Sequence, residues 1–192
     1  MGKIIIITGT PGVGKSRLVK VLADRMKWLF LDIGSIVREE KLYSRFDMQD
    51  RSYVMDEQRV NRRLARFFAN NAPRTMVVEA HTLGPYMPKR PGMRAIVVRL
   101  DPVVLARRLK ARKWSRRKVW ENVEAELIDL SLYESVKLLG PNRVCQIDST
   151  DMKIDELVQQ VQRVLAKRRW EAEEGPDWLG EYDPLELQRR IH

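Results

Sequence analysis

Eight residues near the start of the chain have the types and spacing of a phosphate-binding loop (P-loop). Residues 9–16 read G-T-P-G-V-G-K-S and fit the pattern G-x-x-x-x-G-K-[ST]. Glycines in this pattern let backbone N–H groups point at phosphate oxygens, while the lysine reaches the β- and γ-phosphates and the serine hydroxyl binds Mg²⁺. The loop predicts a nucleoside triphosphate site with contacts from Gly12, Val13, Gly14, Lys15, Ser16 and Arg17.

The residues around this loop supply the structural context that its chemistry needs. Residues 3–8 form a short apolar run rich in isoleucine, which is typical of a buried strand. Beyond the loop, Leu18, Val19 and Leu22 recur at helical spacing, so a helix is expected to about residue 27. Strand, glycine loop and helix in this order place a helix N-terminus at the phosphates and argue against a chance match.

Further strands alternate with helices along the chain, and this order predicts the fold. Strands are expected at 28–31, 75–80, 94–100 and 143–147. Helices are expected at 34–41, 54–71, from 102 onward, at 115–139 and at 154–169, with loops at 43–52 and 84–92. We therefore predict an α/β, three-layer fold, in which a five-stranded parallel sheet carries helices on both faces. Ligands should bind where strands end, near Asp32, His81, Asp101 and Asp148.

Length and composition narrow the class of protein. The 192 residues suffice for one full core, and 44% hydrophobic with 32% charged residues is an ordinary globular balance. No apolar run approaches the ~20 residues of a membrane span, and residues 4–7 lead straight into the P-loop, so we expect neither a membrane partner nor a signal peptide. Cys145 is the single cysteine and fits a reducing compartment. We expect a cytoplasmic protein, either a monomer or a weak oligomer.

The net charge of +10 suggests anionic partners, either phosphorylated nucleotides or RNA. Eight basic residues without an acid fall within 107–118, a second basic group lies at 59–66, and Lys167, Arg168 and Arg169 close a predicted helix. Each group has the alternative of a solvated face, which is favoured for the third group because cations stabilise helix C-termini. So many like charges in the first group instead predict a bound anion.

Several charged residues at predicted strand ends and helices are candidates for phosphoryl chemistry. Arg38 lies one helical turn beyond Gly34, where it is placed to bind an acceptor phosphate. Arg108 and Arg112 share one helical face and could neutralise a transferring phosphoryl group. Glu79 and His81 are spaced by two at a strand end, so both point to the same side.

Each of these candidates also has a structural alternative. Arg38 and Arg112 could form surface ion pairs, and Glu79 could be a structural carboxylate. His81 could orient a water or a substrate hydroxyl, or it could cap a loop. Asp32 could contact the acceptor or cap the helix that follows it.

Taken in order, these motifs resemble the adenylate kinase 6 family, a branch of P-loop nucleoside monophosphate kinases that is also linked to small ribosomal subunit maturation. The resemblance runs from residue 3 to about 165 and includes the P-loop, the segment G-S-I-V-R-E-E-K-L-Y at 34–43, D-E-Q-R-V at 56–60 and the arginines of 108–112. Glu79-Ala80-His81 is its most diagnostic match after the P-loop, because ordinary adenylate kinases lack such a histidine. A guanine-recognition motif N/T-K-x-D is absent from the sequence, which argues against a GTPase.

The resemblance implies that the predicted α/β, three-layer fold is a P-loop kinase fold, and it also implies an activity, cofactors and site roles. It implies ATP and Mg²⁺ as cofactors, AMP or a related nucleoside monophosphate as acceptor, and a small-subunit ribosomal protein and rRNA as partners. Lys15, Arg108, Arg112, His81 and Glu79 would be catalytic, Arg112 would also contact ATP, Gly34, Arg38 and Asp32 would bind the acceptor, and Ser16 and Glu79 would hold the metal. The chain departs from the family at Glu79, where aspartate is common, and after Arg112, where Lys113-Trp114 replaces a frequent glycine.

Two functions are compatible with these residues. In the first, the enzyme moves the γ-phosphoryl group of ATP to AMP, with ATP hydrolysis as a leak when the acceptor is absent. In the second, an assembly factor uses ATP hydrolysis to bind and release a ribosomal protein or rRNA, and His81 positions the attacking water. Both can be true of one protein.

The chain is expected to divide at about residue 170. Residues 1–170 form the kinase-like domain, and 171–192 form an acidic and aromatic C-terminal extension outside the resemblance. The extension holds the acidic run at 171–174, two exposed aromatic residues, Trp178 and Tyr182, and a short helix from about residue 185. It could pack back on the domain, which is the favoured alternative, or act as a partner-binding peptide.

Overall fold

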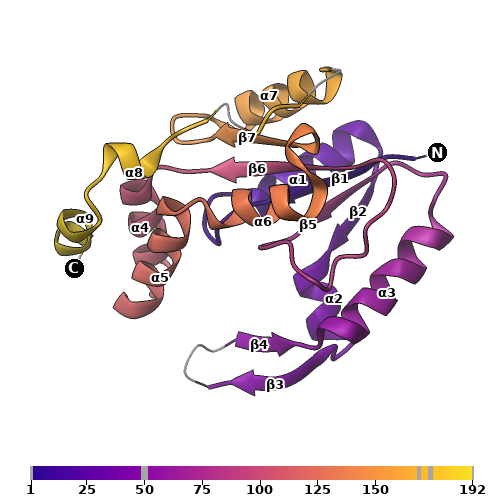
Figure 1. Ribbon diagram of the computed structural model, residues 1–192, viewed down its shortest axis with the longest axis horizontal. Coiled ribbons are helices and arrows are strands. Elements are labelled where there is room, and N and C mark those ends of the chain that lie inside the picture. Colours follow the sequence, from indigo (N-terminus) through magenta and orange to yellow (C-terminus); the bar gives the residue numbers. More distant parts are fainter. Residues whose placement is uncertain (1, 49–51, 168–169, 173–174, 192) are drawn as a thin grey trace.

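A single parallel sheet organises the molecule. The computed structural model describes residues 2–48, 52–167, 170–172 and 175–191. The sheet contains β1 (Ile4–Thr8), β2 (Leu29–Asp32), β5 (Met76–Glu79), β6 (Met93–Arg99) and β7 (Val144–Asp148) in the order β2-β5-β1-β6-β7. Every neighbouring pair of these strands is parallel (Figure 1). The predicted five-stranded parallel sheet is confirmed.

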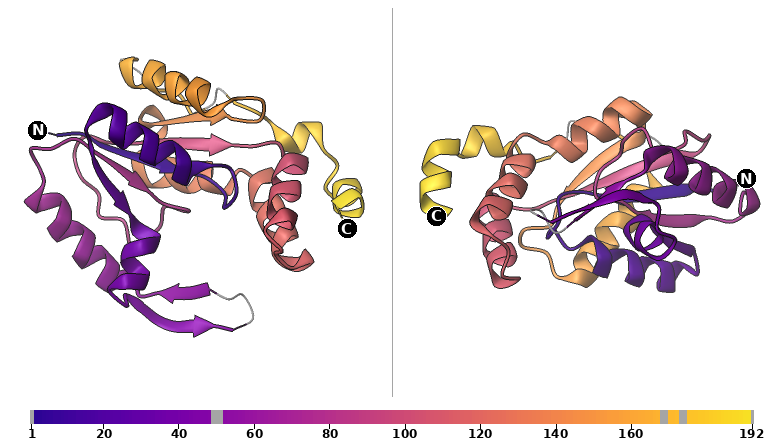
Figure 2. Two further views of the ribbon diagram at one scale, coloured as in Figure 1. Left: turned by 180° about the vertical axis from the view of Figure 1, so that it is seen from behind. Right: turned by 90° about the horizontal axis from the view of Figure 1, so that it is seen from below.

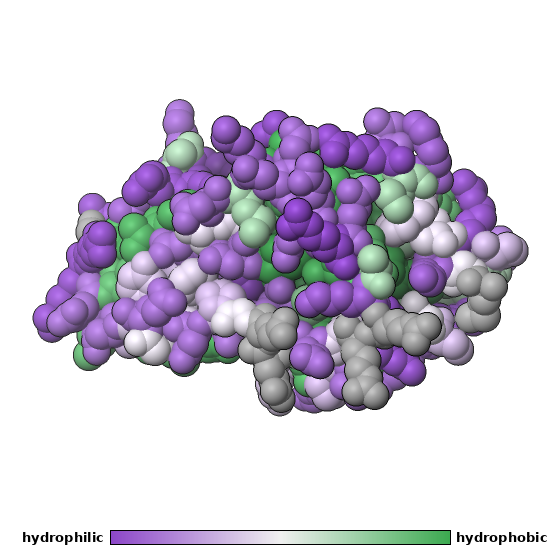
Figure 3. Space-filling model, turned by 90° about the horizontal axis from the view of Figure 1, so that it is seen from above, coloured by the Kyte–Doolittle hydropathy of each residue, from purple (hydrophilic) through white to green (hydrophobic). Residues whose placement is uncertain are grey.

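Helices cover both faces of the sheet, so the predicted three-layer architecture is also confirmed. Ile5 and Ile7 of β1 pack with the helices α1 (Lys15–Met26) and α7 (Ile154–Ala166). Ile4 and Ile6 point to the opposite face, where α3 (Glu57–Asn70) and α6 (Leu130–Leu139) pack (Figure 2). The outer face of α7 is polar, and the side of the molecule that carries it is covered mainly by hydrophilic side chains (Figure 3).

Two structural arms extend beyond the carboxyl ends of the strands. One arm consists of α4 (Pro102–Ala111) and α5 (Arg116–Leu127), joined by the residues 112–115. The other consists of α2 (Ile33–Glu39) and an antiparallel hairpin of β3 (Tyr43–Asp47) and β4 (Ser52–Met55) (Figure 1). The P-loop lies at the base of both arms, because β1 and α1 connect at the same edge of the sheet.

The prediction of a loop at 43–52 is wrong, and so is the predicted start of the next helix. Residues 43–47 and 52–55 pair as strands, and α3 begins at Glu57 rather than at residue 54. Asp56 caps α3, because its side chain accepts a hydrogen bond of 3.1 Å from the backbone N–H of Arg59. Polar residues at alternate positions of the strands suggested a loop, yet the same alternation suits a hairpin with one open face.

The single helix predicted at 115–139 is two helices. The chain leaves α5 at Ile128, passes through Asp129 in the left-handed conformation (φ 55°), and resumes as α6 at Leu130. The break places the carboxylate of Asp129 in an ion pair with Arg99, which is buried in β6. A short 3₁₀ turn at Pro141–Arg143 then leads into β7.

The C-terminal extension packs back on the arm that α4 and α5 form. Its two helices are α8 (Trp178–Glu181) and α9 (Pro184–Ile191). Trp178, Leu187 and Ile191 are buried in the same cluster as apolar residues of α4 and α5, so the expectation that Trp178 is exposed is wrong. Helix α7 ends at Ala166, earlier than predicted. Of the predicted charge groups, Arg168, Arg169, Glu173 and Glu174 lie outside the described residues.

Candidate functional site

Backbone geometry in the P-loop requires its glycines. Gly9 has φ 138°, and a Cβ there would lie 2.3 Å from the carbonyl oxygen of Val98 in the neighbouring strand. A Cβ on Gly12, whose φ is 106°, would lie within 3 Å of the side chains of Leu105 and Leu109 in α4. Gly14 caps α1 without a side-chain hydrogen bond, so no side chain competes for the N–H groups of the first turn. The loop therefore has the geometry of an anion site at a helix N-terminus.

Lys15 lies inside this loop rather than in solvent. Its ammonium group donates hydrogen bonds of 2.5 Å to the carbonyl oxygen of Gly9 and 3.1 Å to that of Thr10. Burial lowers the pKa of Lys15 to about 8, while the nearby carboxylate of Glu79 opposes this shift. The charge is thus held at the loop by carbonyl dipoles and by the carboxylates of Glu79, Glu126 and Asp32, and phosphate oxygens would be stronger partners.

Ser16 and Glu79 join the P-loop to β5. The hydroxyl of Ser16 donates a 2.6 Å hydrogen bond to Glu79 Oε1. Glu79 Oε2 is buried and has no hydrogen-bond partner within the described part of the chain. Burial raises the pKa of Glu79, although the hydrogen bond from Ser16 partly offsets this. A buried carboxylate oxygen without a partner, beside a serine hydroxyl, suits a hydrated divalent cation.

This donor pair would hold Mg²⁺ only together with phosphates and water. Among the residues that the structure describes, no group of three or more His, Cys, Asp or Glu side chains is arranged to hold a metal ion. That finding agrees with P-loop chemistry, in which a serine hydroxyl and the phosphates of the nucleotide supply most of the ligands. Ser16 and Glu79 therefore fit the metal role expected from the sequence.

His81 lies just beyond the end of β5 and lines a cavity of about 860 Å³. Its carbonyl oxygen accepts a hydrogen bond of 3.2 Å from the hydroxyl of Thr8, which fixes the backbone at this point. Desolvation by the cavity walls lowers the pKa of His81 to about 4, and the positive charges of Lys15 and Arg38 lower it further. The imidazole is therefore neutral near pH 7, although the residue as a whole is exposed to solvent.

A cavity of about 860 Å³ extends from the P-loop to both arms. Its walls include nine of the residues that the sequence points to or that stand in the P-loop: Pro11, Gly12, Gly14, Lys15, Ser16, Arg17, Gly34, Arg38 and His81. Arg112 reaches it from the α4–α5 arm. The fold thus brings together residues that are about 100 positions apart in the sequence.

Three other residues expected at strand ends have local partners instead. Asp32 accepts hydrogen bonds from the backbone N–H (3.2 Å) and the hydroxyl (2.7 Å) of Ser35, so it caps α2. Asp101 caps α4, and Asp148 accepts from the backbone N–H of Thr150. None of the three is among the residues that line the cavity, so the expectation that chemistry gathers at all four strand ends holds only for His81.

Asp32 nevertheless bears on Arg38 through a shared partner. The guanidinium of Arg38 donates a 3.1 Å hydrogen bond to the hydroxyl of Ser35, and this hydroxyl donates to Asp32. The arginine is therefore held by a chain of two hydrogen bonds that begins at the α2 cap. Asp32 therefore does not line the cavity, but through Ser35 it helps to hold the cavity residue Arg38 in place.

Arg108 and Arg112 differ in position although they share a helical face. The guanidinium of Arg108 lies over the P-loop and donates long hydrogen bonds of 3.5 Å and 3.3 Å to the carbonyl oxygens of Gly12 and Val13. Partial burial lowers the pKa of Arg108, and the charge of Arg112 adds to the effect. Only Arg112 of this pair is among the cavity-lining residues. Arg108 therefore contacts the P-loop directly, and Arg112 faces the cavity that the P-loop lines.

Comparison with known proteins decides the family. Residues 5–129 match a family model described as an AAA domain. The chain is 33% identical over 158 residues to a "Putative adenylate kinase" of Saccharolobus islandicus, covering 82% of this chain and 81% of that protein. It is 32% identical over 185 residues to a protein of the same name from Methanocaldococcus jannaschii, covering 96% and 98%. The chain belongs to the P-loop nucleoside monophosphate kinase family.

Solved structures of other kinases share the fold of this family member. A shikimate kinase from Bacteroides thetaiotaomicron superimposes with a TM-score of 0.59 at 16% identity, covering 86% of this chain and 99% of that chain. A sugar kinase from Janibacter sp. HTCC2649 gives a TM-score of 0.61 at 15% identity, covering 86% and 95%. At this level of identity the likeness establishes the common fold, and it confirms the predicted P-loop kinase architecture.

The kinase cavity also has wall residues that were not among the predicted site residues. They come from the hairpin, from the connection between α4 and α5, and from α5: Ser52, Tyr53, Met55, Trp114, Lys118, Glu121 and Asn122. Lys118 Nζ lies 5.0 Å from the ring centroid of Trp114, so the two residues form a cation–π pair on the α4–α5 arm. Trp114 follows Arg112 closely in the sequence, and an aromatic residue beside a candidate phosphate ligand is the signal that could have found it.

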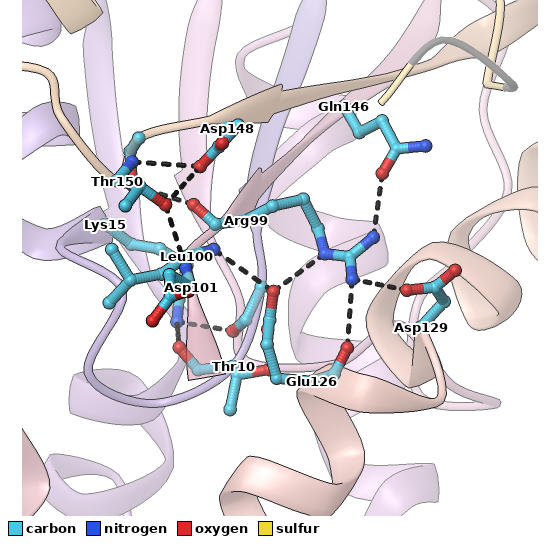
Figure 4. Close-up of polar contacts among 12 residues, drawn as sticks. Thr10, Lys15, Arg99, Leu100, Asp101, Glu126, Asp129, Gln146, Asp148 and Thr150 are labelled. Atoms are coloured by element: carbon cyan, nitrogen blue, oxygen red, sulfur yellow. Dashed lines mark hydrogen bonds and ion pairs between the residues drawn. The ribbon is translucent and has the colours of Figure 1, made fainter. Parts of the chain in front are cut away.

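A buried ionic network fixes α5 to the P-loop of this kinase. Glu126 accepts hydrogen bonds from the hydroxyl of Thr10, from Arg99 Nε (2.7 Å) and from the backbone N–H of Leu100 (3.2 Å) (Figure 4). Arg99 also donates to Gln146 (2.8 Å) and pairs with Asp129. Arg99 and Glu126 are both about 2% exposed, so their charges are compensated within the core.

The structure also describes the partners of the basic groups. Arg63 forms an ion pair of 2.8 Å with Glu40, and Arg117 forms one of 2.7 Å with Glu121. The segment at 107–118 contributes Arg112, Trp114 and Lys118 to the cavity, so part of its charge faces the P-loop. In the described residues, no helix is long and apolar enough to cross a membrane.

Proposed function

We propose that this kinase transfers the γ-phosphoryl group of ATP to AMP, forming two molecules of ADP. The observation that carries the proposal is the common cavity of the P-loop, Arg38 and Arg112. A donor site for a triphosphate and a cation placed for an acceptor phosphate open into one space, as direct transfer requires. The relatives named as adenylate kinases support AMP as the acceptor.

The protein would contribute mainly by positioning the two substrates and neutralising their charge, because phosphoryl transfer passes through a loose transition state. Lys15 would bind the β- and γ-phosphates, and Arg108 and Arg112 would neutralise charge on the transferring group. Arg38 would hold the acceptor phosphate. Ser16 and Glu79 would hold Mg²⁺, which when bound would supply positive charge that offsets the negative charge of the phosphates.

We further propose that the chain belongs to the adenylate kinase 6 branch and hydrolyses ATP when no acceptor is bound. Glu79-Ala80-His81 supports this assignment, since His81 faces the cavity and its lowered pKa leaves it neutral. A neutral imidazole can accept a hydrogen bond from water and orient it. Coupling of this hydrolysis to small-subunit ribosomal protein or rRNA is the second candidate function, and it rests on the resemblance and on this histidine.

The test is ADP production from ATP, measured with and without AMP. We expect AMP to raise the rate strongly, because it replaces a slow leak with transfer. A rate that AMP leaves unchanged argues against the kinase proposal. Addition of a small-subunit ribosomal protein or rRNA fragment then tests the second function, which fails if the partner neither binds nor alters turnover.

The histidine separates the two reactions in the same assay. His81→Ala should reduce hydrolysis without AMP by more than it reduces transfer with AMP, because only hydrolysis needs an oriented water. Equal losses in the two reactions would argue against a water-orienting role. Retained thermal stability of the variant serves as the control for folding.

A further inference from the structure

The β3–β4 hairpin presents an aromatic surface to the cavity. Phe46 lies opposite Tyr53 in the register, and Tyr43 lies opposite Met55. Side chains two apart on a strand share a face, so Tyr53 and Met55 point to the same side. Both residues line the cavity that also contains Arg38. The hairpin therefore turns one face toward the site and leaves its other face to solvent.

Tyr53 occupies the centre of this aromatic surface. Its ring centroid lies 4.3 Å from that of Tyr43, and 5.0 Å from that of Phe46 in an edge-on arrangement. These neighbours restrict the ring, yet Tyr53 remains 41% exposed. A two-stranded hairpin is only marginally stable by itself. An aromatic face left in water adds no packing energy to it, so an exposed aromatic surface of this kind indicates a binding site.

The chemistry around Tyr53 differs from that on the opposite wall. Val37, Met55 and the ring of Tyr53 provide apolar surface on the hairpin side, and Arg38 is the charged residue of this wall. The opposite wall carries the charged or polar side chains of Arg112, Lys118, Glu121 and Asn122. A ligand with one phosphate at Arg38 and a flat apolar body beside it matches the hairpin wall, and a nucleoside monophosphate has this shape.

We propose that Tyr53 is the stacking surface for the base of the acceptor nucleotide and, through it, a determinant of acceptor affinity. The inference rests on the proposed function, since it assigns a residue to the acceptor of that reaction. Stacking tolerates different bases because every base has a π face. Purine monophosphates, with the larger face, should therefore bind better than pyrimidine monophosphates, and AMP and GMP should differ less from each other than either differs from CMP.

The test measures AMP binding directly, by calorimetry on the full chain without ATP. Tyr53→Ala should weaken AMP binding about 5- to 100-fold, which corresponds to the range for losing one base stack. Tyr53→Phe should bind AMP as the unmodified protein does, because the ring remains. Val54→Ala is the matched control, since Val54 is the next residue of β4, 36% exposed, and outside the cavity wall.

The outcomes separate this inference from the proposed function. If the unmodified chain binds AMP and Tyr53→Ala binds it equally well, the stacking role is overturned while the kinase proposal stands. An equal loss in Val54→Ala or in Tyr53→Phe also overturns it, because the effect then belongs to the hairpin fold or to the hydroxyl. If the unmodified chain does not bind AMP, both the proposed function and the inference fail.

Kinetics give a second readout that a structural defect would not mimic. Tyr53→Ala should raise KM for AMP while KM for ATP and the melting temperature stay within about twofold and a few degrees of the unmodified protein. The same variant should also narrow the difference between purine and pyrimidine acceptors. A uniform fall in kcat with an unchanged acceptor preference contradicts the proposal.

Discussion

The hydroxyl of Ser16 donates a 2.6 Å hydrogen bond to Glu79 Oε1 and so connects the first turn of α1 to the end of β5. One partner belongs to the phosphate loop, and the other comes from a strand 63 positions later in the sequence. The second carboxylate oxygen of Glu79 is buried without a partner among the described residues. We propose this pair, Ser16 and Glu79, as the site at which the protein holds Mg²⁺.

Glu79→Gln should weaken the use of Mg²⁺ without unfolding the protein. The amide can still accept the hydrogen bond of Ser16, but it has no negative charge to hold a hydrated cation. Residues that orient metal ligands typically change metal affinity 10- to 100-fold, so the Mg²⁺ concentration for half-maximal activity should rise by about that factor. Titration of Mg²⁺ at saturating ATP checks this, and an unchanged midpoint contradicts the assigned role.

Acidification should destabilise the protein partly through His81. The pKa of His81 is lowered from 6.5 to about 4 in the folded chain, so between these values the unfolded state binds a proton that the folded state does not. The contribution of His81 to stability is therefore complete above pH 6.5 and is lost as the pH falls toward 4. Melting temperatures of the unmodified protein and His81→Asn, taken from pH 7 to pH 4.5, measure this effect.

The comparison isolates the histidine from other titrating groups. Burial raises the pKa of Glu79, which acts in the opposite sense, but Glu79 is present in both proteins and largely cancels. We expect the melting temperature of His81→Asn to fall less steeply with acid. Parallel curves for the two proteins would contradict the lowered pKa.

The buried pair of Arg99 and Glu126 should be essential for stability. Glu126→Ala leaves the guanidinium of Arg99 in the core with Gln146, Asp129 and the backbone carbonyl of residue 126 as its remaining partners. Removal of one member of a buried pair costs about 3–5 kcal/mol. Glu124→Ala is the control, because Glu124 lies two residues earlier in α5 and is exposed. This variant should change stability by less than about 0.5 kcal/mol. Urea unfolding of both variants gives the comparison, and similar values for the two would refute the network's role.

The sequence predicted the parts of the fold that local pattern determines. Runs such as 4–7 and 76–78 are apolar and rich in β-branched residues, so their strands were predictable, and the P-loop is readable because its glycines serve one geometry. The break at Asp129 was not predictable, because it depends on Arg99, which lies 30 positions away. Tyr53 was missed for a similar reason, since it joins the cavity only when the hairpin folds over it, whereas the position of Trp114 close to Arg112 was a local signal that went unused.

Docking of the C-terminal extension should also stabilise the α4–α5 arm. Leu187 is 2% exposed within the cluster that includes residues of both helices, so Leu187→Ala should cost about 2–5 kcal/mol. Leu185 lies two residues earlier in the same helix and is 65% exposed, so Leu185→Ala is the matched control. Unfolding monitored by tryptophan fluorescence compares the two, and an equal effect would mean that the extension does not contribute through packing.

The extension also makes polar contacts with the same arm. Tyr182 donates a hydrogen bond to the carboxylate of Asp101, and Lys110 donates one to the carbonyl oxygen of Ile191. The arm also carries Arg112 and Trp114, which line the cavity. Loss of the packing at Leu187 should therefore lower activity as well as stability, most clearly near the melting temperature.

In the proposed reaction, the γ-phosphoryl group passes from ATP to AMP within one cavity. The most direct measurement follows a radiolabel placed on the γ-phosphorus of ATP in the presence of AMP. With the unmodified protein the label should appear in ADP, and Arg38→Ala should divert it toward inorganic phosphate because the acceptor is no longer held. Label that appears only as inorganic phosphate with the unmodified protein, at any AMP concentration, would show that the protein does not transfer the phosphoryl group to AMP.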